Sequence, residues 1–356
     1  MSSRAKYSRL LLSIDGKDDL MEFVQRLTYT EAIGELDGMT ATLRVPPSKL
    51  SKLAKTLEPG TAFTMETYQG STKGLKREGD VIAVTYEQVG QNYTVVLVGV
   101  NYLHRLRAAS ITEVWKKSHS DIVKAIAGRA SPKLTAKVQG VNTTADFTFQ
   151  QNETDAVFLM RLAREHNYIC RVVGKELHFA RTDTATGSLK LDYDQDVKSI
   201  RLTANLKDYV NEVTVYWGDP EDSDGLKITK NKQTVSSAKM KVYNEKSKLG
   251  PSLGKKAFGV TKKLVIGGYD SPLYKKQTQA EAKAKSELTA ASMSFIEGVA
   301  VCRGCPKAAC GAELEIEGAF WPFNGSFYIS KVFHEWTVSG LTTELSFKSN
   351  SLPKSK

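Results

Sequence analysis

The chain has 356 residues, with 50 Lys and Arg against 39 Asp and Glu, so its formal net charge is +11 at pH 7. An apolar fraction of 41% excludes a disordered chain, and no apolar run reaches the roughly 20 residues of a membrane-spanning helix. The length predicts roughly two or three domains, and the basic excess permits nucleic acid, an acidic protein or a membrane surface as partner without choosing among them.

The first nine residues are basic, but the apolar run at Leu10–Leu12 is too short for the core of a signal peptide. We therefore expect the protein to be made in the cytoplasm without a signal peptide.

Residues 1–102 are predicted to form a first, mostly β domain. The strands expected from alternating apolar residues are Leu10–Ile14, Gly38–Val45, Ala62–Tyr68, Asp80–Val89 and Tyr93–Tyr102. A short helix is expected over Lys49–Leu57, after the two prolines that end the second strand. Short strands separated by glycines at this spacing favour a small antiparallel barrel or sandwich.

Residues 103–187 change to an α/β pattern. A first helix is expected to contain Ile122–Ala127, with Ser118 or Ser120 as its cap. A polar turn at Gln150–Asn152 then opens a second amphipathic helix, in which Thr154 or Asn152 accepts hydrogen bonds from the first free N–H groups. Two strands around the turn at Gly174-Lys175 complete the segment as a hairpin.

Residues 188–356 are predicted to form a second β-barrel domain with two additions. One is a lysine-rich insertion at about 224–263, which has weak periodicity and is expected to consist of extended chain or long loops. The other is a helix over Thr278–Met293. The expected strands are Val197–Leu202, Asn211–Trp217, Glu313–Glu317, Ser326–Val332 and Thr342–Phe347. The predicted fold class is therefore α+β, mainly β: two small antiparallel barrels with an α/β segment between them.

The cysteines leave two interpretations open. Cys302 and Cys305 have the spacing of half a zinc or redox site, and Cys310 lies close by, but the second pair of such a site is missing. The alternative, reduced structural thiols, suits a protein made in the cytoplasm. The sequence does not decide the role of these three residues.

Titratable residues do not form a recognisable catalytic motif. His334-Glu335 begins like a zinc-protease helix but falls in a strand pattern and lacks the second histidine. The remaining histidines, His104, His119, His166 and His178, are scattered among predicted turns and element ends. Asp192, Asp194 and Asp196, and the acidic loop at 219–224, lack the full pattern of a calcium loop. We therefore expect no catalytic, cofactor or metal site, and no enzymatic activity.

Several segments, taken in order, resemble one family. These are Tyr93–Leu106, the capped helix from Ser118, the segment Gln150–His166 with its hairpin, the alanine-rich helix, and the strand Phe323–His334. Together they resemble the hub domain of VgrG proteins and the late-control D proteins of contractile phage tails.

The resemblance implies a homotrimer in which two barrels per chain form a pseudo-sixfold ring. Such a hub joins a hexameric tail tube to a trimeric spike at the baseplate of a phage or phage-tail-like injection particle. Because the chain stops at Lys356, the resemblance implies that the spike is a separate polypeptide. The implied partners are a second and third copy, the tail tube protein, the spike protein and other baseplate proteins, with no stable membrane insertion.

Two other uses of the basic charge remain open. Lysines facing a central channel would favour passage of DNA or another negatively charged cargo, whereas the simpler interpretation is a solvated or partner-facing surface. A basic β-barrel that binds nucleic acid is the alternative function, because aromatic residues alternate with lysines around Tyr269–Lys276.

Overall fold

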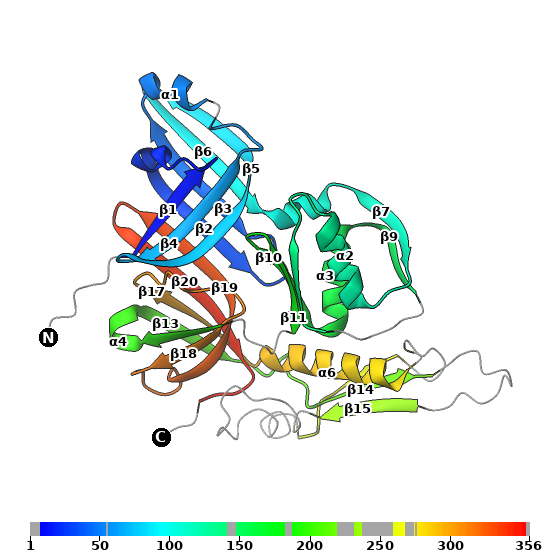
Figure 1. Ribbon diagram of the computed structural model, residues 1–356. Helices are drawn as coiled ribbons and strands as arrows, with labels where there is room; N and C mark the ends of the chain where they lie inside the picture. Colours follow the sequence, from blue (N-terminus) through cyan, green and yellow to red (C-terminus); the bar gives the residue numbers. More distant parts are fainter. Residues whose placement is uncertain are drawn as a thin grey trace.

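The computed structural model describes residues 8–54, 56–140, 147–181, 187–218, 231–236, 259–267, 274 and 276–353. These residues build four hydrophobic cores. We call the parts around them the N-terminal β unit, the α/β unit, the C-terminal β unit and the α6 unit. The two β units lie one above the other, and the other two units lie beside them (Figure 1).

The N-terminal β unit is built from six long strands. They are β1 (Ser8–Ile14), β2 (Val24–Ala32), β3 (Gly38–Val45), β4 (Ala62–Gln69), β5 (Thr72–Val89) and β6 (Asn92–Asn101). Alternate residues of β3, from Met39 to Val45, are buried, as the period of two predicts. A short 3-10 helix, Asp19–Phe23, and α1 (Pro47–Leu53) complete the unit. The expected helix over 49–57 therefore begins earlier and ends earlier, with Pro47 in its first turn, where the missing N–H costs nothing.

The C-terminal β unit continues the same sheet. Its elements are β12 (Ser188–Asp192), α4 (Tyr193–Asp196), β13 (Val197–Ala204), β17 (Ile296–Cys302), β18 (Glu313–Glu317), β19 (Gly325–Thr337) and β20 (Gly340–Ser349). Within the described residues the main path of this twelve-stranded sheet runs β1-β4-β5-β6-β3-β2-β19-β20-β17-β13. Strands β2 and β19 pair antiparallel, with Tyr29 opposite His334. The predicted mainly β class is confirmed, and the strands of the two predicted β domains lie together in one large curled sheet.

The α/β unit packs two helices against short strands. It consists of the 3-10 helix Tyr102–Arg107, β7 (Ser110–Trp115), α2 (His119–Arg129), β8 (Thr135–Val138), β9 (Thr148–Thr154), α3 (Asp155–His166), β10 (Tyr168–Val173) and β11 (Glu176–Arg181). The buried faces of α2 and α3 share one core, in which Ile122, Phe158 and Leu162 are fully covered. The two predicted helices and the hairpin β10–β11 are confirmed.

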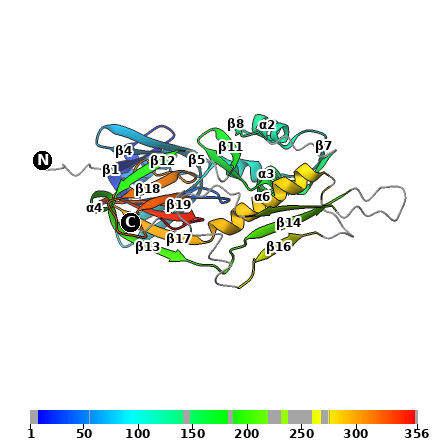
Figure 2. The same ribbon diagram turned by 90° about the horizontal axis from the view of Figure 1, so that it is seen from below.

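The α6 unit is a small sheet covered by one helix. Strands β15 (Asn231–Ser236), β14 (Glu212–Trp217) and β16 (Lys263–Ile266) lie in that order, and α6 (Gln277–Met293) crosses one face, as Figure 2 shows. The helix buries Ala280, Ala284 and Leu288 against Val213 and Val215. Most of the predicted lysine-rich insertion lies outside the described residues, but β15 and the start of β16 fall within its range.

Strand β9 is one strand that the sequence did not predict. Gln150–Asn152, expected as a turn, belongs to strand β9, which pairs with β7 through Trp115 opposite Thr148. Polar residues can occupy this strand because only one of its faces is covered. Of the three aspartates considered for a calcium loop, Asp194 and Asp196 lie in the short helix α4 and Asp192 is its N-cap. Among the described helices, none has the length and hydropathy to cross a membrane.

A glycine substitution tests the packing of the N-terminal β unit. A Cβ on Gly79 would meet the carbonyl oxygen of Val100 and lie 2.7 Å from the ring of Phe63. Gly79→Ala should therefore destabilise the protein by about 1–3 kcal/mol in a urea unfolding experiment, because backbone cannot move aside cheaply. Gly38→Ala is the matched control, since its nearest neighbour is 3.8 Å away; equal stability of the two variants would contradict this packing.

Candidate functional site

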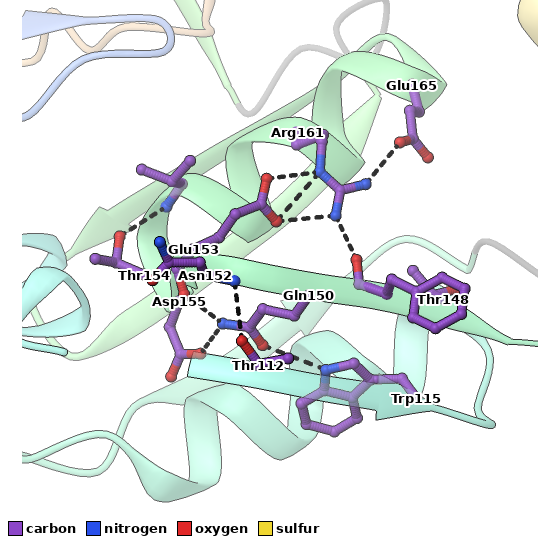
Figure 3. A network of polar contacts seen from close by, with 12 residues as sticks. Thr112, Trp115, Thr148, Gln150, Asn152, Glu153, Thr154, Asp155, Arg161 and Glu165 are labelled. Carbon is purple, nitrogen blue, oxygen red and sulfur yellow. Dashed lines mark hydrogen bonds and ion pairs between the residues drawn. The ribbon is translucent and has the colours of Figure 1, made fainter. Parts of the chain in front are cut away.

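The segment that precedes α3 forms a dense polar network (Figure 3). Thr154 is the N-cap of α3, and its hydroxyl accepts a hydrogen bond from the N–H of Val157 at 3.3 Å. Buried Gln150 accepts from the indole N–H of Trp115 at 3.3 Å and donates to the Asp155 carboxylate at 3.0 Å. The predicted cap is confirmed, and the network holds β7, β9 and α3 together.

Two arginines complete this network. Arg129 forms a two-pronged ion pair with Asp155, and Arg161 binds Glu153 at 2.9 Å and Glu165 at 3.2 Å. Arg161 also donates to the carbonyl of Phe149 at 2.6 Å. All these partners belong to the chain itself, so the polar residues that mark the segment are used to fix its shape.

A second network lies where three units meet. Glu31 on β2 accepts from Arg77 on β5 and from Arg171 on β10, the latter at 2.8 Å. The backbone N–H of Cys310, in the C-terminal β unit, also donates to Glu31 at 3.1 Å, and Arg171 donates to the carbonyl of Cys310. The two arginines and Glu31 are at most 6% exposed. We call Glu31, Asp37, Arg77 and Arg171 the junction network.

The two carboxylates of the junction network differ in their charge environment. Burial opposes ionisation of Glu31, but the Arg77 and Arg171 guanidinium groups hold the pKa of Glu31 well below its usual range. Burial raises the pKa of Asp37 to about 7, since its nearest cation is Arg171 at 3.7 Å and Glu31 adds like charge. Sequence reasoning missed this network; the available signal was a charged residue, Arg171, within an otherwise apolar strand.

Another contact ties the N-terminal β unit to the loop before β18. The buried hydroxyl of Thr67 donates to the carbonyl of Pro306 at 2.6 Å and accepts from the N–H of Leu75 at 2.8 Å. The two β units therefore contact each other through the β2–β19 pairing, the junction network and this bond.

The histidines are placed in four different settings. His104 pairs with Asp80 at 2.6 Å, His178 lies 3.2 Å from Glu176, and buried His334 contacts the Thr343 hydroxyl at 2.9 Å. His119 and His166 come together, with ring nitrogens 2.7 Å apart. His334-Glu335 lies in strand β19, as the sequence predicts. The structure thus brings together one pair, His119 and His166, which the sequence left scattered.

All four cysteines are free and buried. Burial raises the pKa of the Cys170 and Cys310 thiols to about 12, and the neighbouring Cys302 together with burial raises that of Cys305 still further. Free thiols in buried positions fit the interpretation of reduced structural thiols.

The described surface offers some apolar contact groups. Val114 and Phe149 lie opposite each other on β7 and β9. These two side chains and that of Phe147 are each at least 52% exposed.

A cavity of about 440 Å³ lies between α6 and the paired strands β2 and β19, lined by Ala32, Tyr328 and Met293 among others. Exposed apolar groups that lie together often mark contact sites between proteins.

The residues behind the nucleic-acid alternative are only partly described. Tyr269 and Lys275 lie outside the described residues, as do most lysines of the insertion and the acidic loop at 219–224. Tyr274 packs against the core of the α6 unit, and burial raises its pKa to about 12. A tyrosine held in this way is not part of an open stacking platform for bases.

The comparisons with known proteins concern both sequence and fold. A family model described as the Alg8 N-terminal domain matches residues 112–337. No curated protein matches the chain in sequence.

Solved structures similar to this chain include proteins of phage tails and secretion systems. The 43 kDa tail protein of prophage MuSo2 from Shewanella oneidensis is 13% identical, with a TM-score of 0.65 over 96% of this chain and 98% of that one. A tail protein from Neisseria meningitidis MC58 is 12% identical, with a TM-score of 0.63 over 96% and 97%. An Escherichia coli type VI secretion component, described as similar to T4 tail proteins gp27 and gp5, is 10% identical, with a TM-score of 0.60 over 97% and 77%. The chain therefore has a tail-protein fold.

The junction network predicts a large effect of one substitution. Arg171→Met should destabilise the protein by about 3–5 kcal/mol, because it leaves Asp37 without a cation and Glu31 with only one. Urea unfolding measures the loss. Arg26→Ala is the control, because its ion pair with Glu335 is exposed and worth at most about 1 kcal/mol. Similar losses in both variants would contradict the role of the junction network.

Asp37 predicts a pH dependence of stability. Its pKa in the folded protein, about 7, lies above the value of about 3.8 for a free carboxyl, so folding favours the protonated form. The contribution of Asp37 to the free energy of unfolding is fully present below about pH 4 and is lost as the pH rises through 7. The total loss is at most about 4 kcal/mol. In the Asp37→Asn variant this loss should be absent, because an amide does not titrate. The free energy of unfolding of the unchanged protein should therefore fall relative to that of the variant as the pH rises from 4 to 8. Parallel curves would show that Asp37 does not titrate in this range.

Proposed function

The chain belongs, over residues 112–337, to the family described as the Alg8 N-terminal domain, and from its fold we propose that it is the structural hub of a tail or tail-like injection particle. That family description names no tail component, so the proposal depends on the fold. The observation that carries it is the match in fold over nearly the full length of both chains with the tail protein from Shewanella oneidensis.

In the proposed particle, three copies form a ring with two β units per copy. The ring presents six similar surfaces to a hexameric tail tube and threefold symmetry to a separate trimeric spike. Such a role consists of protein contacts and requires no enzymatic chemistry. The partners are two further copies, the tube protein, the spike protein and other baseplate proteins, and the protein resides in the assembled particle.

One end of the sheet supports assembly with further copies. Among the described strands, β13 pairs only with β17, so its outer edge is a side on which another chain can pair. Strand β1 pairs only with β4, but the 3-10 helix Asp19–Phe23 lies beside it, and the N–H of Leu12 donates to Met21 Sδ at 3.3 Å.

The oligomeric state tests this proposal. Native mass spectrometry of the purified chain, at several concentrations, should show a species of three times the mass of one chain. Mixing with the tube and spike proteins encoded by the same genome should then produce complexes that contain three copies. A chain that stays monomeric, alone and with both partners, would refute the hub.

A further inference from the structure

The contact between α2 and α3 holds three groups that are suited to a transition metal. His119 is the first residue of α2, and Glu165 and His166 lie in the last turn of α3. Their ligand atoms all lie within 4.8 Å of one another, and the His119 Nδ1 to His166 Nε2 distance is 2.7 Å. Within the described residues, these are the His, Cys, Asp and Glu side chains that converge in this way.

We propose that His119, His166 and Glu165 form a binding site for Zn²⁺ that fastens helix α2 to helix α3. Two imidazoles and one carboxylate are a ligand set of zinc, with a water molecule or another group in the fourth position. Calcium and magnesium prefer sites made of oxygen atoms, so the ligand set favours zinc over both. The inference concerns the folding of the α/β unit and stands independently of the hub proposal.

Two of the three proposed ligands, His119 and Glu165, each contact a further side chain that orients them. The Nε2 of His119 lies 3.1 Å from the Thr148 hydroxyl, so Nδ1 is left to face the metal. Glu165 accepts from Arg161 through one oxygen, at 3.2 Å, which leaves the other oxygen for the ion. Partners of this kind fix the ring and carboxylate orientation in known zinc sites.

The charges around the site leave one negative group to neutralise. Arg161 is paired with both Glu153 and Glu165, and Lys283 on α6 is paired with Glu287 at 2.6 Å. Two cations thus face three carboxylates, which leaves one negative charge in the group to which Glu165 belongs. The C-terminal end of α3 also favours a cation, because the last carbonyl groups of a helix carry partial negative charge.

The two rings face each other, with one nitrogen of each in the contact. In the metal-free protein one ring donates its proton to the other across the 2.7 Å contact. Tetrahedral zinc with bonds of about 2.0 Å holds two ligand nitrogens about 3.3 Å apart, so the rings must separate by about half an ångström. Binding therefore requires that proton to move to the other nitrogen of the same ring, which stays neutral.

The test is a calorimetric titration of the full chain, prepared without a histidine tag, with Zn²⁺ and in parallel with Mg²⁺. We expect one Zn²⁺ per chain, no saturable Mg²⁺ binding, and a higher melting temperature with zinc, because a ligand of the folded state stabilises it. Cobalt(II) in place of zinc should give the visible absorption of a four-coordinate ion. A zinc titration without a saturable site would overturn the proposal.

The variants separate ligation from folding. His166→Ala, and Glu165→Gln as a milder change, should lose zinc binding, while Thr148→Val should weaken it by about 10-fold or more through the outer partner of His119. His178→Ala is the matched control, because His178 also faces a carboxylate in the α/β unit but belongs to a different pair. Equal loss of binding in His178→Ala and His166→Ala would contradict the assignment, and melting curves without metal verify that each variant is folded.

Discussion

A buried ion network at a single point joins three parts of this protein that are far apart in sequence. Glu31 receives hydrogen bonds from Arg77, Arg171 and the backbone of Cys310, which come from two β units and the α/β unit. Burying such charges is costly unless each is paired, so the network is stable only when all three units are in place. This requirement makes the arrangement of the units specific, because a displaced unit would leave a buried charge without its partner.

The other contacts between the units lie around the junction network. Strands β2 and β19 pair directly beside the network, with Glu31 opposite Val332, and this pairing makes one sheet of two β units. The α/β unit is fixed on the side by Arg171, and by the amide of Asn101, which donates to the carbonyl of Val172 at 3.0 Å.

Much of the fold could be predicted from the sequence, because many of its strands and helices depend on local patterns such as alternating apolar residues and helix caps. Alternating residues located β3 and β18 with the correct ends, and the Thr154 cap marked the start of α3. Strand β9 was missed because its residues are polar and it pairs with β7, where Trp115, 35 positions before Gln150, donates to the amide of Gln150. The pairing of β2 with β19 joins residues about 300 positions apart, and no local pattern specifies it.

The candidate sites were less predictable than the fold, for a physical reason. His119 and His166 are separated by 47 positions, and only the packing of α2 on α3 brings their rings together. Arg171 gave a signal, since an arginine within an apolar strand needs a buried partner, but the sequence did not identify Glu31 as that partner. The domain boundaries at 102 and 187 remain predictions, while the separate core of the α6 unit was not foreseen.

The most direct test of the hub is electron cryomicroscopy of the intact particle from the producing bacterium. The proposal predicts three copies of this chain in a ring between the end of the tail tube and the spike, with the two β units of each copy alternating around the ring. A particle in which the chain lies elsewhere, or in which another protein occupies the position between tube and spike, would contradict the proposed function.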